Sequence, residues 1–174
     1  TWLTGYLDEI PWKCGIAWPD PTAGLHAAAA TLVALLDRQC CGLKGQTIEV
    51  AQAETAINMI GQHIVASQTG VTSRRWGNRR PGRAPQGVYP CVGRDRWIAI
   101  AVIDDASWNG LCEVTGMADL KHLEIDERWR RHDEIDQRLS SFTAKCDDRI
   151  LMKDLQEAGV PAGAVPDPED VADA

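Results

Sequence analysis

Asp20 is the first residue of the chain whose type and setting suggest chemistry. It lies between Pro19 and Pro21, directly before a run of small and apolar residues that reads TAGLHAAAATLVALL. Aspartate followed by proline is a preferred N-cap of a helix. A carboxylate at a helix N-terminus is also kept ionised by the helix dipole, and an ionised aspartate can attack an acyl group as a covalent nucleophile. The residues alone leave both interpretations open, with the cap as the more common outcome.

A cluster of arginines is the second feature with chemical potential. It forms the one concentrated positive charge of an acidic chain and consists of Arg74, Arg75, Arg79, Arg80 and Arg83. Glycines and prolines surround these residues, so a solvated linker is one interpretation. The alternative is a clamp for phosphate or carboxylate, because a guanidinium group binds such anions through two parallel hydrogen bonds. Trp76 would then stack on a purine, or it would simply hold the linker in place.

The histidines and cysteines give no sign of a metal site. The six cysteines form no C-x-x-C motif, and no Cys/His spacing is typical of zinc, so we expect no metal. Free cysteines are usually buried, which favours reduced thiols in a cytoplasmic protein. His26 lies alone on an apolar helix and is expected to be structural. His122 and His132 lie among charged residues and are expected at the surface.

Composition and charge exclude several classes of protein. The net charge of −7 argues against a general nucleic-acid binder, because such proteins neutralise a phosphate backbone. The longest apolar run, residues 27–36, is too short to cross a membrane. The first residues also lack the basic start and apolar core of a signal peptide.

Hydrophobic periodicity predicts a mainly helical first part and a small α+β second part. Helices are expected over about 21–41, with Gly42 as the stop, and over 52–66, with a short strand at 47–51 between them. The second part should contain a β-hairpin with strands at 88–92 and 97–102. Helices are expected within 104–116, which starts with an aspartate cap, over 126–145, and within 147–159, which Gly159 closes, followed by a strand within VPAGAV. The apolar faces of the first two helices lack partners in this chain, so we expect a homodimer or larger assembly.

The stretch PDPTAGLHAAAATLVALLDRQCCGLKGQTIEVAQAETAINMI resembles the active-site region of class III CoA-transferases, the family of formyl-CoA transferase, carnitine CoA-transferase and α-methylacyl-CoA racemase. The matching positions, in order, are Asp20, Gly24, Leu35, Arg38, Gly42, Gly45 and Gln46. The later blocks GNRRPGRAPQGVYPCVGRDRWIAIAV, WNGLCEVTG, LQEAGVPAGAV and DPEDV resemble the small domain of that family. The resemblance therefore extends over nearly the whole chain.

The resemblance implies a domain organisation and a reaction. Residues 1–66 would be part of the family's large domain, 67–86 an arginine-rich linker, and 87–174 the small α+β domain. Asp20 would attack an acyl-CoA thioester, forming first a mixed anhydride and then an aspartyl-CoA thioester, and CoA would pass to a carboxylic acid. We expect Arg79, Arg80 and Arg83 to contact coenzyme A.

The length of the chain keeps other roles open. Members of this family are longer than this chain and form interlocked dimers. A partial-length chain could instead be a non-catalytic relative that acts as a binding or assembly module. It could also be a subunit that completes its site with a separate large-domain partner.

Overall fold

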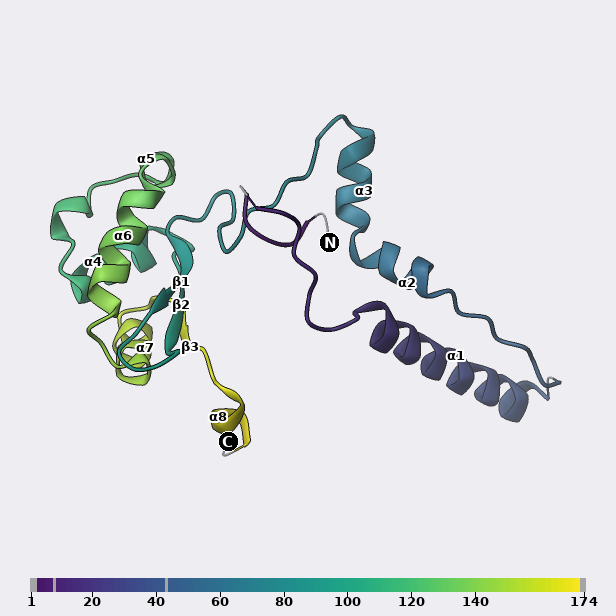
Figure 1. The fold of residues 1–174 in the computed structure, drawn as a ribbon. Helices are drawn as coiled ribbons and strands as arrows, with labels where there is room; N and C mark the ends of the chain where they lie inside the picture. The colour runs from purple at the N-terminus through teal and green to yellow at the C-terminus, as the bar shows by residue number, and fades with distance from the viewer. Residues whose placement is uncertain (1–2, 8, 43, 173–174) are drawn as a thin grey trace. The chain divides into compact units, whose positions relative to one another are not determined.

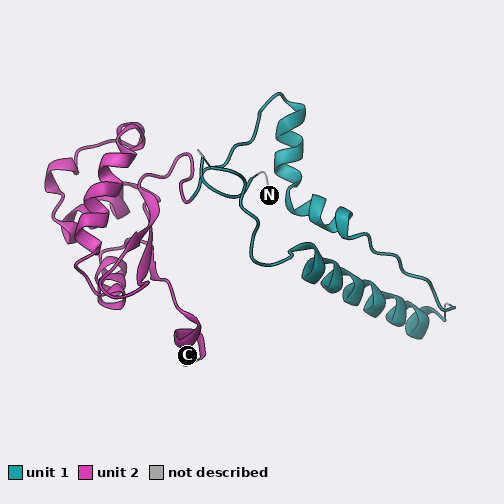
Figure 2. Ribbon diagram, viewed as in Figure 1, with its two compact units in different colours: residues 1–77 teal, residues 78–174 magenta. Residues whose placement is uncertain are grey.

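The chain folds into two compact units of different character (Figure 1, Figure 2). The computed structural model describes residues 3–7, 9–42 and 44–172. Unit 1 covers Thr1–Gly77 and unit 2 covers Asn78–Ala174. Within the described residues, unit 1 contains only helices and irregular segments, whereas unit 2 combines a small antiparallel sheet with helices. The expected α+β fold class is therefore confirmed.

Unit 1 is built from α1 (Pro19–Cys41), α2 (Gln52–Met59) and α3 (Gly61–Gln68). The end of α1 agrees with the prediction, since Gly42 adopts the left-handed conformation at φ 66° that stops a helix. The chain then returns through an extended segment and brings α2 beside the first turns of α1 (Figure 1). This return creates the contact between α1 and α2.

Two expectations for unit 1 were wrong. Residues 47–51 form no strand, because a strand needs a neighbouring strand for its hydrogen bonds and the described part of unit 1 provides none. The single helix expected over 52–66 is broken at Ile60, whose φ of −107° and ψ of 15° lie outside the helical region. Gly61 follows the break, and glycine is a poor helix former.

Unit 2 contains a three-stranded antiparallel sheet in the order β1-β2-β3. The predicted hairpin is formed by β1 (Gln86–Pro90) and β2 (Trp97–Ala101), and the predicted third strand is β3 (Ala162–Ala164). Its helices are α4 (Asp105–Thr115), α5 (Ile125–Arg130), α6 (His132–Thr143), α7 (Asp148–Glu157) and α8 (Pro168–Ala172), with a 3₁₀ turn, η1, at Ala118–Leu120. The helix expected over 126–145 is divided at Arg131 into α5 and α6.

The core of unit 2 lies between the sheet and its helices. In Figure 1 α4, α6 and α7 gather against one face of the sheet. The side chains buried there include Ile98, Ile100, Trp108, Leu111, Ile135, Leu139 and Leu155. The predicted aspartate cap of α4 is present as a capping box: Ser107 N–H donates to Asp104 Oδ1 at 2.8 Å, and Asp104 N–H donates to Ser107 Oγ at 3.1 Å.

The boundary between the units falls within the arginine-rich stretch 67–86, and arginines of this segment make contacts in each unit. On the side of unit 1, Arg75 donates to the carbonyl oxygens of Tyr6 and Glu9 at 3.0 and 2.9 Å. On the side of unit 2, Arg79 Nη2 contacts Asp136 Oδ2 at 2.5 Å. Two of the five arginines therefore hold the backbone of this segment.

The thiols are less buried than expected. Cys91 and Cys112 are buried, but Cys40 and Cys41 are exposed at the end of α1. None of the described helices is long and apolar enough to cross a membrane.

Candidate active site

Asp20 lies in the first turn of α1, which begins two residues earlier than the cap interpretation requires. The helix starts at Pro19, Trp18 occupies the N-cap position, and no side chain there makes a capping hydrogen bond. The cap interpretation of Asp20 is therefore wrong. The physical reason for this difference is Pro19, because a proline suits the first helical position and Pro19 therefore moves the helix start upstream of Asp20.

The carboxylate of Asp20 is exposed, and one of its oxygens is held from α2. Gln52 is the first residue of α2, and its side-chain Nε2 donates to Asp20 Oδ1 at 2.9 Å. Oδ2 of Asp20 has no hydrogen-bond partner among the described residues. The α1 dipole favours negative charge at this position. The arrangement presents one carboxylate oxygen of fixed orientation and one free oxygen at a helix N-terminus.

Sequence reasoning missed Gln52. The sequence does give one signal: Gln52 is a polar residue at the start of α2, and the preceding residue, Ala51, has no side chain that could cap the helix. Nothing local identifies its partner, because Asp20 lies 32 residues upstream.

His26 has the structural role that was expected. Its ring Nδ1 lies 2.8 Å from the carbonyl oxygen of Thr22, one turn back along α1. Among the described residues, no hydrogen bond links this ring to the carboxylate of Asp20. His63 is similarly engaged, with its Nδ1 2.9 Å from Ser73 Oγ.

Arg79, which was predicted to contact coenzyme A, is already bound to two carboxylates of α6. Its Nη2 lies 2.6 Å from Asp133 Oδ1 and 2.5 Å from Asp136 Oδ2. Asp136 also accepts a hydrogen bond from Tyr89 Oη at 2.7 Å, and burial raises the pKa of that phenol. These contacts make Arg79 an anchor of the chain on α6.

His132 belongs to the same cluster and corrects an expectation, since it is buried and not at the surface. Its Nε2 accepts a hydrogen bond from the backbone N–H of Gln86 at 3.2 Å, which assigns the ring proton of the neutral form to Nδ1. Burial lowers the pKa of His132, and the nearby charge of Asp136 only partly opposes that shift.

Arg80 and Arg83 differ from Arg79 in having no ion pair with any described residue. They face each other across an isolated antiparallel bridge, and Arg83 N–H donates to the Arg80 carbonyl at 3.1 Å. Both belong to unit 2, whereas Asp20 belongs to unit 1. Of the predicted site residues, the structure therefore places Arg80 next to Arg83, and it places Asp20 next to Gln52.

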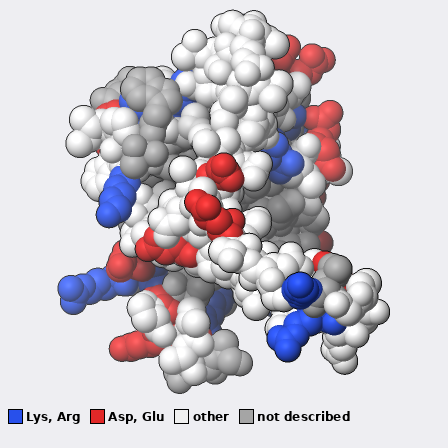
Figure 3. Space-filling model, turned by 90° about the vertical axis from the view of Figure 1, so that its right-hand side faces the viewer, with Lys and Arg blue, Asp and Glu red and all other residues white. Residues whose placement is uncertain are grey.

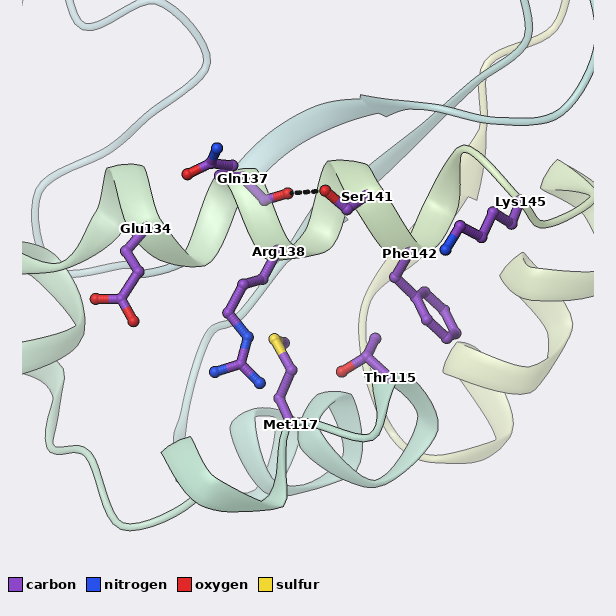
Figure 4. A pocket seen from close by; sticks show the side chains of 8 residues that line it. All are labelled: Thr115, Met117, Glu134, Gln137, Arg138, Ser141, Phe142 and Lys145. Carbon is purple, nitrogen blue, oxygen red and sulfur yellow. Dashed lines mark hydrogen bonds between the residues drawn. The ribbon is translucent and has the colours of Figure 1, made fainter.

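A hollow of about 430 Å³ on unit 2 is lined by Thr115 of α4, by residues of α6, and by Met117 and Lys145 (Figure 4). Two of its charged side chains are already paired: Arg138 binds both carboxylate oxygens of Asp119, and Glu134 binds Arg131. Ser141 donates to the carbonyl of Gln137 at 2.8 Å. These two charged groups of the hollow therefore bind residues outside its lining, and the Ser141 hydrogen bond joins two residues of α6.

Charged side chains are sparse on part of the surface. In Figure 3 most of the visible face carries neither basic nor acidic side chains, and the charged side chains lie in small separate groups.

Among the described residues, no group of three His, Cys, Asp or Glu side chains could hold a metal ion.

Two curated relatives are CoA-transferases. The chain is 30% identical over 171 residues to the succinyl-CoA–D-citramalate CoA-transferase of Chloroflexus aurantiacus, a match that covers 94% of this chain and 41% of the relative. It is 27% identical over 171 residues to the succinate–glutarate CoA-transferase of Agrobacterium fabrum, with the same two coverages of 94% and 41%. The chain thus spans about two fifths of the length of these relatives.

A solved structure and a family model agree with these matches. A CAIB/BAIF family protein from Brucella suis superposes with a TM-score of 0.87 at 27% identity, covering 99% of this chain and 46% of that protein. The model of CoA-transferase family III matches residues 1–174. With a family match over its whole length, the chain belongs to CoA-transferase family III.

Proposed function

We propose that this chain takes part in moving CoA from an acyl-CoA to a carboxylic acid, with Asp20 as the covalent nucleophile. The observation that carries the proposal is the carboxylate of Asp20, exposed in the first turn of α1 and held at one oxygen by Gln52. A carboxylate in this setting is fixed in direction and open to an incoming thioester. Membership of CoA-transferase family III supports the same reaction.

The proposed reaction begins when Asp20 Oδ2 attacks the carbonyl carbon of the acyl-CoA thioester. The carbon–sulfur bond breaks, CoA leaves as a thiolate, and a mixed anhydride remains on Asp20. The thiolate then attacks Cγ of Asp20, which releases the donor acid as a carboxylate and leaves an aspartyl-CoA thioester. The acceptor carboxylate displaces CoA from Cγ, and the thiolate finally attacks the acceptor's acyl carbon, which regenerates the carboxylate of Asp20.

Arg79, Arg80 and Arg83 remain predicted contacts of coenzyme A. Arg80 and Arg83 support the prediction, because a pair of arginines without carboxylate partners among the described residues suits the phosphates of CoA. Arg79 would contribute by anchoring the segment, since its guanidinium already contacts Asp133 and Asp136. Replacing Arg80 and Arg83 by Gln should weaken CoA binding in isothermal titration calorimetry, and unchanged binding would remove them from the site.

Trapping of the covalent intermediate tests the nucleophile. Incubation with succinyl-CoA or acetyl-CoA and hydroxylamine should convert Asp20 to a hydroxamate that peptide mass spectrometry locates. The Asp20→Asn variant, which keeps the shape but not the charge, should give no adduct. An adduct on another residue, or none in folded protein, would refute the proposal for this chain.

A second candidate function is that of a non-catalytic assembly module, or of a subunit whose site is completed by a large-domain partner. In the absence of such a partner, this chain would then form a homodimer or larger assembly. The observation that favours it is the open apolar face of α1, where Leu25 is 71% exposed and Leu32 is 62% exposed. Multi-angle light scattering should then give a mass above that of one chain. A lone, monodisperse monomer that forms the hydroxamate would exclude this candidate.

A further inference from the structure

Asp20 and Gln52 each sit in the first turn of a helix, yet neither side chain caps its own helix. The N-caps of α1 and α2 are Trp18 and Ala51, and neither makes a side-chain capping bond. The two polar side chains instead bond to each other at 2.9 Å across the junction of α1 and α2. Both side chains are thus available for a role other than helix capping.

The packing of unit 1 is concentrated at this contact. Among the described residues of α1, α2 and α3, only Ala23 and Thr55 are buried, at 8% and 5% exposure. Ala23 lies three residues after Asp20, and Thr55 lies three residues after Gln52, so each buried residue shares a helix face with one member of the pair. Thr55 Oγ1 also donates to the carbonyl oxygen of Gln52 at 2.8 Å.

We propose that Gln52 is a further catalytic residue, whose side-chain amide first orients Asp20 and then stabilises the negative charge that develops on Asp20 Oδ1. The inference rests on the proposed role of Asp20 as nucleophile. It assigns the two carboxylate oxygens different tasks: Oδ2 attacks the thioester, and Oδ1 stays bound to Gln52 throughout the reaction.

The chemistry follows from which atoms change. Once Oδ2 is acylated, Oδ1 is the carbonyl oxygen of the anhydride. The CoA thiolate adds to Cγ, and the electron pair of the Cγ–Oδ1 double bond moves onto Oδ1. The double bond then re-forms, the Cγ–Oδ2 bond breaks, and the donor acid departs as a carboxylate that carries Oδ2.

The same oxygen is charged again in the second half of the reaction. When the acceptor carboxylate adds to the aspartyl-CoA thioester, the charge again develops on Oδ1, and CoA leaves as the thiolate. A donor placed 2.9 Å from this oxygen lies at the distance at which oxyanion-hole donors act. The first acylation is different, because its charge develops on the oxygen of the incoming acyl group, away from Gln52.

The difference between these steps gives a specific test. The two adducts are separable by mass spectrometry of the intact, acid-quenched protein after mixing with succinyl-CoA, because the anhydride adds the mass of the acyl group and the thioester adds that of CoA. Gln52→Met keeps the length of the side chain and removes its N–H donors. We expect it to slow formation of the CoA adduct by about tenfold or more. The acyl adduct should be slowed much less, because that step loses only the orientation of Asp20 and no charge stabilisation on Oδ1.

Three matched variants complete the experiment. Gln52→Lys returns an N–H donor at similar reach and should recover part of the lost rate. Gln39→Met replaces an exposed glutamine of α1 and should leave both adducts unchanged. Met59→Leu removes the 3.6 Å contact between Thr22 Oγ1 and the Met59 sulfur, and so tests whether loosening α2 from α1 is sufficient for the effect.

Each outcome separates the two proposals. Absence of both adducts in the parent chain would refute Asp20 as nucleophile in this chain. Adducts in the parent that form equally fast in Gln52→Met would refute the role of Gln52 alone. An equal loss of both adducts in Gln52→Met and in Met59→Leu would reduce Gln52 to a structural tie between the helices.

Discussion

The two units of this chain treat their apolar residues in opposite ways. Unit 2 encloses its large side chains, so that Trp108 is 1% exposed and Leu111 is 0% exposed. Unit 1 leaves Leu25 and Leu32 of α1 open at 71% and 62% exposure. Hydrophobic burial is the main favourable contribution to folding. The comparison therefore locates most of the stability of this chain in unit 2. It locates the candidate chemistry in unit 1, at the packed contact between α1 and α2.

Removing a leucine from each unit gives the largest expected contrast. Leu111→Ala should lower the free energy of unfolding of unit 2 by about 3 kcal/mol, because it leaves a cavity in a packed core. Leu32→Ala should change the free energy of unfolding of unit 1 by only about 0.5 kcal/mol or less, since the side chain of Leu32 is mostly in water. Urea titrations followed by tryptophan fluorescence measure both, and comparable losses would show that the apolar face of α1 is covered.

Replacing one glycine in each unit by alanine should change stability in opposite directions. A Cβ built on Gly110 of α4 would overlap the carbonyl oxygen of Ala158, so Gly110→Ala should destabilise unit 2 by about 1–3 kcal/mol. A Cβ on Gly24 of α1 would meet nothing within 4 Å, so Gly24→Ala should stabilise α1 by about 0.5–1 kcal/mol.

Thermal melts followed by circular dichroism test the glycine pair. The melting temperature of Gly110→Ala should fall, and the helical signal of Gly24→Ala should persist to higher temperature. If Gly24→Ala lowers helix stability instead, another surface approaches α1 at this residue, and the open character of unit 1 would have to be rejected.

The two units also differ in what could be predicted from sequence. Periodicity and turn residues placed α1, its stop at Gly42 and the hairpin, because these depend on neighbours along the chain. The breaks at Ile60 and Arg131 were missed, since each falls within a continuous helical pattern. A periodic pattern gives the face of a helix more reliably than its ends.

Buried polar residues were the other failure, and the reason is physical. Arg128 is 1% exposed, because it pairs with Asp105 at 2.7 Å and stacks on the ring of Trp108 at 5.2 Å. A charged residue is buried only when distant elements supply its partners. Gln52 is exposed, but it was missed for a related reason, since its hydrogen-bond partner Asp20 lies on another helix. Asp20, by contrast, is proposed as a site residue because of the motif around it, and that role stays a prediction.

The smallest expected effect concerns the histidines, which again differ in their surroundings. His132 is 2% exposed and its pKa is lowered from the ordinary value of 6.5 by burial. The unfolded chain therefore binds a proton at this site before the folded chain does. The stabilising contribution is complete above about pH 6.5 and is lost as the pH falls toward the lower folded pKa.

His132→Gln should therefore flatten the pH dependence of stability below about pH 6.5 by roughly 1 kcal/mol or less across that range. His122→Gln is the matched control in unit 2, because that side chain is exposed. Urea midpoints measured between about pH 5 and 7 make the comparison. Equal slopes in parent and His132→Gln would mean that His132 binds its proton as readily in the folded state, contrary to its position between Gln86 and Asp136. If only His122→Gln reduces the slope of stability against pH, the acid sensitivity of unit 2 would lie at its surface and not in the buried cluster around His132.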